Sequence, residues 1–180
     1  MLFRSQYGEI RLGRDQVPTW TIFADFDPFN TVGVATSVAS YQTLGGIDTR
    51  QSADNAVSYF LPSTLGGVYG QLTVAAGEGT AGKKYTGGRI GYRAGPVDVS
   101  GAYSETDVIV DKVKLGVVAA SYNFGFARLI GTFTQQDFQA AKDRNGTVAV
   151  VVPVGAWQFK GQFTKEDGSG SLEGKSAKSY

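Results

Sequence analysis

The sequence predicts an all-β protein whose strands run up and down in a single antiparallel meander. Three observations support this fold class. Four glycine-centred turns recur about 30 residues apart, at Gly66, Gly95, Gly125 and Gly155. The segments on both sides of each turn alternate apolar and polar residues, which is the period of a half-buried strand. The 25 glycines, against 5 prolines, suit a sheet with many tight turns better than a helical bundle.

Composition excludes several classes of function. The chain has 180 residues, enough for one domain, but it lacks any run of about 18 apolar residues that a membrane-spanning helix needs. The net charge of +1, with no concentrated basic face, argues against a nucleic-acid partner. Cysteine and histidine are both absent, which removes disulfides, most zinc sites and most hydrolase triads. We therefore expect no enzyme, no cofactor and no metal site.

The first predicted strand runs from Tyr7 to Arg14. It places Ile10 and Leu12 on one face and Glu9 and Arg11 on the other. This alternation is typical of a strand with one apolar and one polar side.

The long segment at residues 15–50 is predicted to be a loop. It carries Trp20, Phe23, Phe26 and Phe29, together with Asp25 and Asp27 before Pro28. Loops of this length in compact domains are functional or disordered, and the aromatic side chains favour packing against the rest of the protein. For the two aspartates, a simple turn role beside Pro28 is the alternative.

Four hairpins follow this loop, so that about nine strands are predicted in total. Their strand pairs are 55–61 with 68–76, 85–93 with 97–104, 114–123 with 127–134, and 148–154 with 157–164. The strand at 114–123 keeps no single register, which predicts a β-bulge there. The connections on the far edge are polar and glycine-rich and are expected to be exposed loops, at residues 77–84, 105–111, 135–146 and 166–178.

The loop at residues 77–83 (GEGTAGK) also matches the glycine pattern of a phosphate-binding loop. Such a loop needs Ser or Thr after the lysine and a helix directly behind it. Here Lys84 and an alternating strand follow, so an exposed connection is expected instead.

The two faces of the strands favour a transmembrane β-barrel. The polar face mixes Arg, Gln, Thr and Ser, which suits a wet lumen, and the apolar face ends in Tyr, Trp or Phe near the turns, like an aromatic girdle. A soluble β-barrel or sandwich that binds a ligand in its interior shows the same alternation and is the alternative. The barrel should require detergent, whereas the alternative should not.

The order of several segments resembles the trimeric general porins of Gram-negative proteobacteria. These segments are GEIRLGR, DPF, DNAVSYFLP, LGGVYGQL, RIGYRAGPVDVSGAY, AASYNFGFARL and VVVPVGAWQFKGQF, and the resemblance covers nearly the whole chain. It implies a barrel of about 16 strands in the outer membrane, of which about nine are present here. It further implies a homotrimer in contact with outer-membrane lipid, and a water-filled channel for passive diffusion of small hydrophilic solutes and ions.

The resemblance also implies a pore constriction. In that family the loop after the LGR strand folds back into the barrel and narrows the pore, with acidic residues facing basic residues on the wall. This puts Asp25 and Asp27 on the constriction loop and Arg14 on the wall opposite, with Arg11 added from its face of the strand. Further wall residues expected from face assignment are Arg89, Arg93, Arg128, Lys160 and Ser58.

Two departures from the family pattern leave the sign of ion selectivity open. Arg14 is followed by Asp15, where relatives often have glutamine. Ser58 stands where relatives often carry an arginine, so one positive charge of the wall is missing.

Both ends of the chain predict an internal fragment. Met1 to Gln6 contain no apolar stretch of the kind a signal peptide needs, and Ser176 to Tyr180 resemble the beginning of another strand. We expect one partial barrel domain across residues 1–180, with strands missing before and after it.

Overall fold

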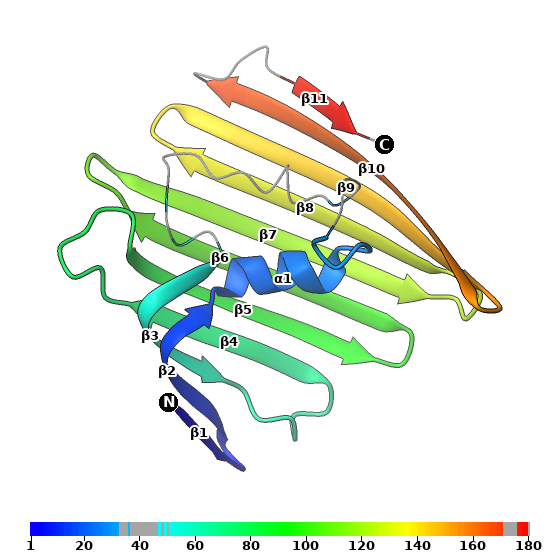
Figure 1. Ribbon diagram of the computed structural model, residues 1–180, viewed down its shortest axis with the longest axis horizontal. Coiled ribbons are helices and arrows are strands. Elements are labelled where there is room, and N and C mark those ends of the chain that lie inside the picture. Colours follow the sequence, from blue (N-terminus) through cyan, green and yellow to red (C-terminus); the bar gives the residue numbers. More distant parts are fainter. Residues whose placement is uncertain (33–35, 37–46, 48, 50, 171–175, 180) are drawn as a thin grey trace.

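The computed structural model is one antiparallel sheet of eleven strands, in which each strand pairs with its neighbours in sequence (Figure 1). The structure describes residues 1–32, 36, 47, 49, 51–170 and 176–179. The strands are β1 (Leu2–Ser5), β2 (Gly8–Gln16), β3 (Ser52–Phe60), β4 (Val68–Ala75), β5 (Lys84–Ala94), β6 (Val97–Asp107), β7 (Lys112–Asn123), β8 (Arg128–Phe138), β9 (Ala141–Val154), β10 (Trp157–Gly170) and β11 (Ser176–Ser179). The predicted all-β meander is confirmed.

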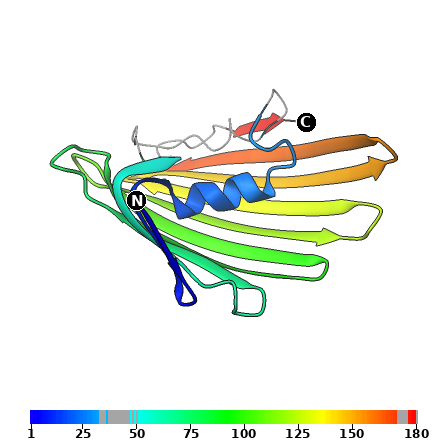
Figure 2. The ribbon, with the colours of Figure 1, turned by 60° about the horizontal axis from the view of Figure 1, so that its bottom comes forward.

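The sheet is curved, and one helix lies on its inner side (Figure 2). This helix, α1 (Pro18–Phe26), contacts strands β4 to β8. Within the described ranges, no helix has the length and apolar character needed to cross a membrane.

The repeated glycines form the turns that the sequence predicts. Gly66, Gly95, Gly125 and Gly155 all have positive φ, between 53° and 87°, where a side chain would be strained. Two of the turns have only two residues between their strands, Gly95-Pro96 and Gly155-Ala156. Positive φ at the first of the two residues is the backbone geometry of a tight hairpin turn.

The strands extend beyond their predicted ends, so several predicted loops are wrong. The loop predicted at 135–146 is a two-residue turn, Gln139-Ala140, because β8 and β9 continue through polar residues. In the same way, β6 continues to Asp107 and β10 to Gly170. At these strand ends both faces carry polar side chains, so polarity alone did not indicate a loop. Residues 171–175 of the predicted final loop lie outside the described residues.

The predicted bulge in the strand at 114–123 is also wrong. Strand β7 pairs with β6 and β8 in an unbroken register. The sequence lacks a clear alternation there because Leu115 and Val117 on its inner face pack under α1, while Val118 on its outer face is exposed and apolar too. A register shift occurs instead between Gly13 and Asp15, where β2 pairs with β3.

The segment predicted as a loop at 15–50 contains the end of β2 and helix α1. Pro18 stands at the start of the helix, where its missing N–H group costs nothing. Trp20, Phe23 and Phe26 recur at helical spacing and are all buried, which is the signal that the loop prediction missed. The remainder of this prediction, at 33–35, 37–46, 48 and 50, lies outside the described residues.

The described part of the sheet has two strands more than the predicted nine. No strand is predicted before Tyr7, yet Leu2–Ser5 pairs with β2 as β1. Ser176 to Tyr180 is predicted only as the beginning of a strand, and Ser176–Ser179 pairs with β10 as β11. Tyr180 itself lies outside the described residues.

The outer face of the sheet is apolar and the inner face is largely polar. Exposed on the outer face are, among others, Leu72, Val74, Ile90, Tyr92, Val118 and Phe159. Buried on the inner face are Ser58, Gln71, Thr73, Ser104, Thr106 and Thr147. In a soluble protein the apolar set is expected to be the buried one, so this distribution suits a wall with lipid outside and water inside.

Candidate functional site

Helix α1 is anchored to the inner face of the sheet by its apolar residues. Trp20, Phe23 and Phe26 are buried in one cluster with Leu115 and Ile130 of the wall. The rings of Trp20 and Phe23 stack with their centroids 5.5 Å apart. This packing fixes the position of the polar residues at the end of the helix.

Asp25 connects the helix to the wall. Its Oδ2 atom accepts a hydrogen bond from Nη1 of Arg89 on β5 at 3.1 Å. The Arg89 side chain is only 12% exposed, and that of Asp25 is 40% exposed. The pair is thus half sheltered from water, and the negative charge of Asp25 is compensated by a wall arginine.

A tyrosine lies between two wall arginines next to this pair. The guanidinium carbons of Arg89 and Arg93 lie 5.6 and 5.3 Å from the centroid of the Tyr69 ring. Gly91 lies between the two arginines in β5 and pairs with Tyr69 across the strands. A Cβ atom at Gly91 would overlap the ring, so glycine is needed for this stack.

Asp98 completes the cluster. It accepts a hydrogen bond from the Tyr69 hydroxyl at 2.8 Å and another from Nε of Arg93 at 2.7 Å. Tyr69, Gly91 and Asp98 were not predicted as site residues. The sequence signal that could have found them is the Arg-x-Gly-x-Arg spacing of β5, which puts two cations and a gap on one face.

A cleft of about 370 Å³ lies between the end of α1 and the wall. Four of the predicted site residues line it, namely Asp25, Asp27, Arg128 and Lys160. Arg128 donates hydrogen bonds to Oγ of Ser121 at 3.1 and 3.3 Å. Lys160 places its Nζ atom 5.8 Å from the centroid of the Phe29 ring. Among the described residues, neither cation forms an ion pair with a carboxylate.

Asp27 is engaged within its own loop. Its Oδ2 atom accepts hydrogen bonds from the backbone N–H of Thr31 and from the hydroxyl of Thr36, and its side chain is buried. This geometry agrees with the turn role that the sequence left open. Both carboxylates of the cleft are therefore already engaged, Asp25 by Arg89 and Asp27 within its own loop. The two cations of the cleft have no carboxylate partner among the described residues.

The whole chain, residues 1–180, matches the family model of the Gram-negative porins. The chain belongs to this family. A curated relative, outer membrane porin protein 32 of Delftia acidovorans, is 33% identical over 141 residues, covering 69% of this chain and 39% of that porin.

Solved structures agree with the family match. An anion-selective porin from Comamonas acidovorans has a TM-score of 0.81 and 29% identity, covering 93% of this chain and 56% of that chain. OmpT of Vibrio cholerae has a TM-score of 0.71 at 12% identity, a likeness of fold alone. The chain therefore spans less than two thirds of the length of these relatives, 39% of the Delftia acidovorans porin and 56% of the Comamonas acidovorans porin.

Membership of this porin family confirms the resemblance and the fold class. Together with the relative named as an outer membrane porin, it places the protein in the outer membrane of a Gram-negative bacterium. The alternative of a soluble β-barrel or sandwich is not favoured, because exposed apolar side chains cover the outer face.

Arg14 and Arg11 lie apart from the cleft of this porin chain. Arg14 donates a hydrogen bond to Ser52 at 3.1 Å, pairs with Asp54 at 3.5 Å, and lines a separate cleft of about 280 Å³. Arg11 pairs with Glu9 and Asp15 on its own strand. The wall residue that the structure places against Asp25 is Arg89, not Arg14.

Ser58 faces the inner side of the sheet, as predicted, but has no exposed surface. Its hydroxyl forms a hydrogen bond with that of Thr73 at 3.0 Å. Ser58 therefore does not line an open passage, contrary to the expectation from the sequence. The alternation of apolar and polar residues predicts which face of the sheet a residue lies on, but not which neighbouring groups cover it.

Proposed function

We propose that this protein forms a water-filled channel of the outer membrane, through which small hydrophilic solutes and ions pass by passive diffusion. The observation that carries the proposal is the two-faced wall, with exposed apolar side chains outside and polar and charged side chains inside. Such a wall has a use only where lipid lies on one side and water on the other. No catalytic step is part of the proposal.

Helix α1 and the residues after it are proposed to narrow the channel. The support is its position on the inner face, held by an apolar cluster and by the Asp25–Arg89 pair. The single-domain boundaries of 1–180 and the constriction loop at 15–50 stay predictions within this proposal.

The channel is further proposed to prefer anions. Asp25 and Asp98 are each paired with an arginine, so their negative charge is compensated. Arg128 and Lys160 line the cleft without a carboxylate partner among the described residues, and these two cations outnumber the remaining carboxylate of the cleft, Asp27, so the local potential is positive. A positive potential in a narrow wet passage raises the local concentration of anions and hinders cations. The similar Comamonas acidovorans porin is described as anion-selective.

A planar bilayer tests both parts of the proposal. The purified protein should give stepwise conductance, and under a KCl gradient the reversal potential should have the sign for chloride permeation. The double variant Arg128→Gln, Lys160→Gln should move it toward zero, whereas Lys112→Gln, on an exposed strand end, should leave it unchanged. A wild-type channel that selects cations would refute the anion preference. Solubility without detergent and no conductance would restore the soluble alternative.

The homotrimer implied by the family resemblance also remains a proposal. Light scattering of the detergent-purified protein, corrected for bound detergent, should give three times the mass of one chain. A monomeric mass would contradict the trimer without affecting the channel proposal.

A further inference from the structure

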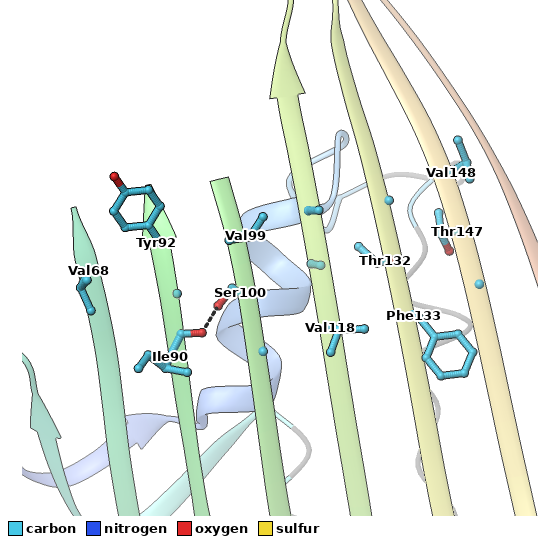
Figure 3. Close-up of a pocket in the computed structure, with 16 residues that line it drawn as sticks. Val68, Ile90, Tyr92, Val99, Ser100, Val118, Thr132, Phe133, Thr147 and Val148 are labelled. Atoms are coloured by element: carbon cyan, nitrogen blue, oxygen red, sulfur yellow. Dashed lines mark hydrogen bonds between the residues drawn. The ribbon is translucent and has the colours of Figure 1, made fainter. Parts of the chain in front are cut away.

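A groove of about 790 Å³ crosses the outer face of strands β4 to β9 (Figure 3). Its sides are apolar and include Ile90, Val118, Phe133 and Val148. In Figure 3, α1 lies behind the sheet, so the groove is on the opposite face from the proposed constriction. The groove is therefore no part of the channel.

Small residues form the bottom of this groove. Gly131 pairs with Ala120 on one side and with Val148 on the other, and Gly146 pairs with Phe133. A Cβ atom at Gly131 or Gly146 would meet no atom within 4 Å, so no neighbouring group requires glycine at either position. Their effect is to hollow a surface that is otherwise covered by large apolar side chains.

One end of the groove meets two cations. Gly146 pairs with Lys165 of β10, and Arg144 lies two residues before Gly146 on the same outer face of β9. Nε of Arg144 donates a hydrogen bond to Oε1 of Gln135 at 3.1 Å. Asp167 lies opposite Arg144 in the register of β9 and β10, but its carboxylate forms an ion pair with Lys165 at 2.7 Å. Among the described residues, Arg144 forms no ion pair with a carboxylate. Thus an apolar groove ends at a guanidinium group that has capacity for a further acceptor.

We propose that this groove is a binding site for a phosphate-bearing lipid. One acyl chain lies over Gly131 and Gly146, and the phosphate contacts Arg144 and Lys165. The charge at the end of the groove favours an amphiphile over a second copy of the apolar wall, because an apolar partner would cover the charged guanidinium group and leave its remaining N–H donors without an acceptor. The lipid's phosphate supplies that acceptor, and its chain fills the hollow.

This proposal depends on the membrane location of the protein and not on its conductance or ion selectivity. A failure of the channel measurements would therefore leave it standing. Likewise, a failure to find lipid binding would leave the channel proposal standing, since the lipid site lies on the other side of the sheet from the cleft.

Native mass spectrometry of the detergent-solubilised protein can test the site. Dioleoyl phosphatidic acid is titrated in, with dioleoyl phosphatidylcholine as the lipid of equal chains and no net charge. We expect one molecule of phosphatidic acid to bind per chain, with higher affinity than phosphatidylcholine. Filling the groove by Gly131→Leu or Gly146→Leu should weaken this binding about tenfold, because several methylene groups lose their contact. Gly161→Leu is the matched control, since Gly161 also has open space around it but does not line the groove.

The variant Arg144→Gln tests the phosphate contact without filling the groove. Its side chain is exposed, so folding should be unaffected. Phosphatidic acid should bind about fivefold more weakly, whereas phosphatidylcholine, whose phosphate charge is offset by its choline group, should lose clearly less affinity. Equal effects of Gly131→Leu and Gly161→Leu would overturn the site and leave only unspecific lipid contact. Equal affinity for the two lipids in the wild type, or displacement by glycerol phosphate alone, would overturn it as well.

Discussion

At the scale of single residues, the inner wall is organised around contacts that cross between strands. The stack of Arg89, Tyr69 and Arg93 holds two guanidinium groups at fixed positions beside Asp25 and Asp98. Cation–π contacts of this kind contribute about 0.5–2 kcal/mol each, depending on how far they are from water. They also limit the rotamers of two long side chains, so the charges stay in place.

Gly91→Ala is expected to disturb this stack. The added methyl group overlaps the Tyr69 ring, so the ring must move and release both arginines. We expect a loss of about 1–3 kcal/mol in the free energy of unfolding, which is typical of overpacking. The channel's reversal potential should change as well. Gly161→Ala, with open space at its Cβ position, is the control, and equal behaviour of the two variants would contradict the role of the stack.

Arg89→Gln and Asp25→Asn should shift ion selectivity in opposite directions. The first removes a positive charge and leaves Asp25 without its partner, which favours cations, and the second does the reverse. One charge at about 7 Å in water-like surroundings changes the energy of a monovalent ion by about 0.6 kcal/mol, with opposite sign for anion and cation, so the permeability ratio changes about sevenfold. Reversal potentials of both single variants and the double variant measure this. Shifts of the same sign would show that the pair does not face the conducting path.

Residue roles were only partly predictable from the sequence. Alternation puts Arg89, Arg93, Arg128 and Lys160 on the inner face, and all four are there. It does not give the partner of Asp25, because that depends on where α1 crosses the sheet. The burial of Ser58 and the gap at Gly91 were unpredictable for a similar reason, since both depend on neighbouring strands and their register.

At the scale of elements, helix α1 is the part that the sequence analysis did not resolve. The hairpins were predictable because each glycine turn requires a backbone conformation that few other residues adopt. The helix was missed because a nine-residue segment offers only four strong apolar positions, and Pro18 and Pro28 near its two ends favour a loop. Its stability comes from the wall beneath it.

Phe23→Ala should loosen the helix from the wall. The side chain is 4% exposed in the cluster with Leu115 and Ile130, and truncation of a buried phenylalanine costs about 3–5 kcal/mol. If α1 narrows the channel, single-channel conductance should rise and become noisier. Thr21→Ala, on the same helix but outside the cluster, should have a much smaller effect. Unchanged conductance in Phe23→Ala would separate the helix from the proposed constriction.

At the scale of the whole molecule, the wall is organised inside out with respect to a soluble protein. Ile90 is 63% exposed on the outer face, so a soluble protein would tolerate a charge at this position. In a membrane wall, Ile90→Arg should cost about 2–4 kcal/mol near the middle of the bilayer. The yield of folded protein in outer membranes should fall, whereas Thr86→Arg, near the charged strand end, should be tolerated. Equal yields would argue against lipid at this face.

Because each strand pairs with its neighbours in sequence, the sheet also sets the order in which the parts of the chain fold. Apart from β2 and β3, which are separated by residues 17–51, neighbouring strands are joined by short connections, so most of the sheet can grow strand by strand with little entropy lost at each step. Helix α1 is an exception, because it comes before β4 to β8 in sequence but packs on them. It has no surface to dock on until five later strands are in place. The interior of this chain is therefore completed last, after its outer wall has formed.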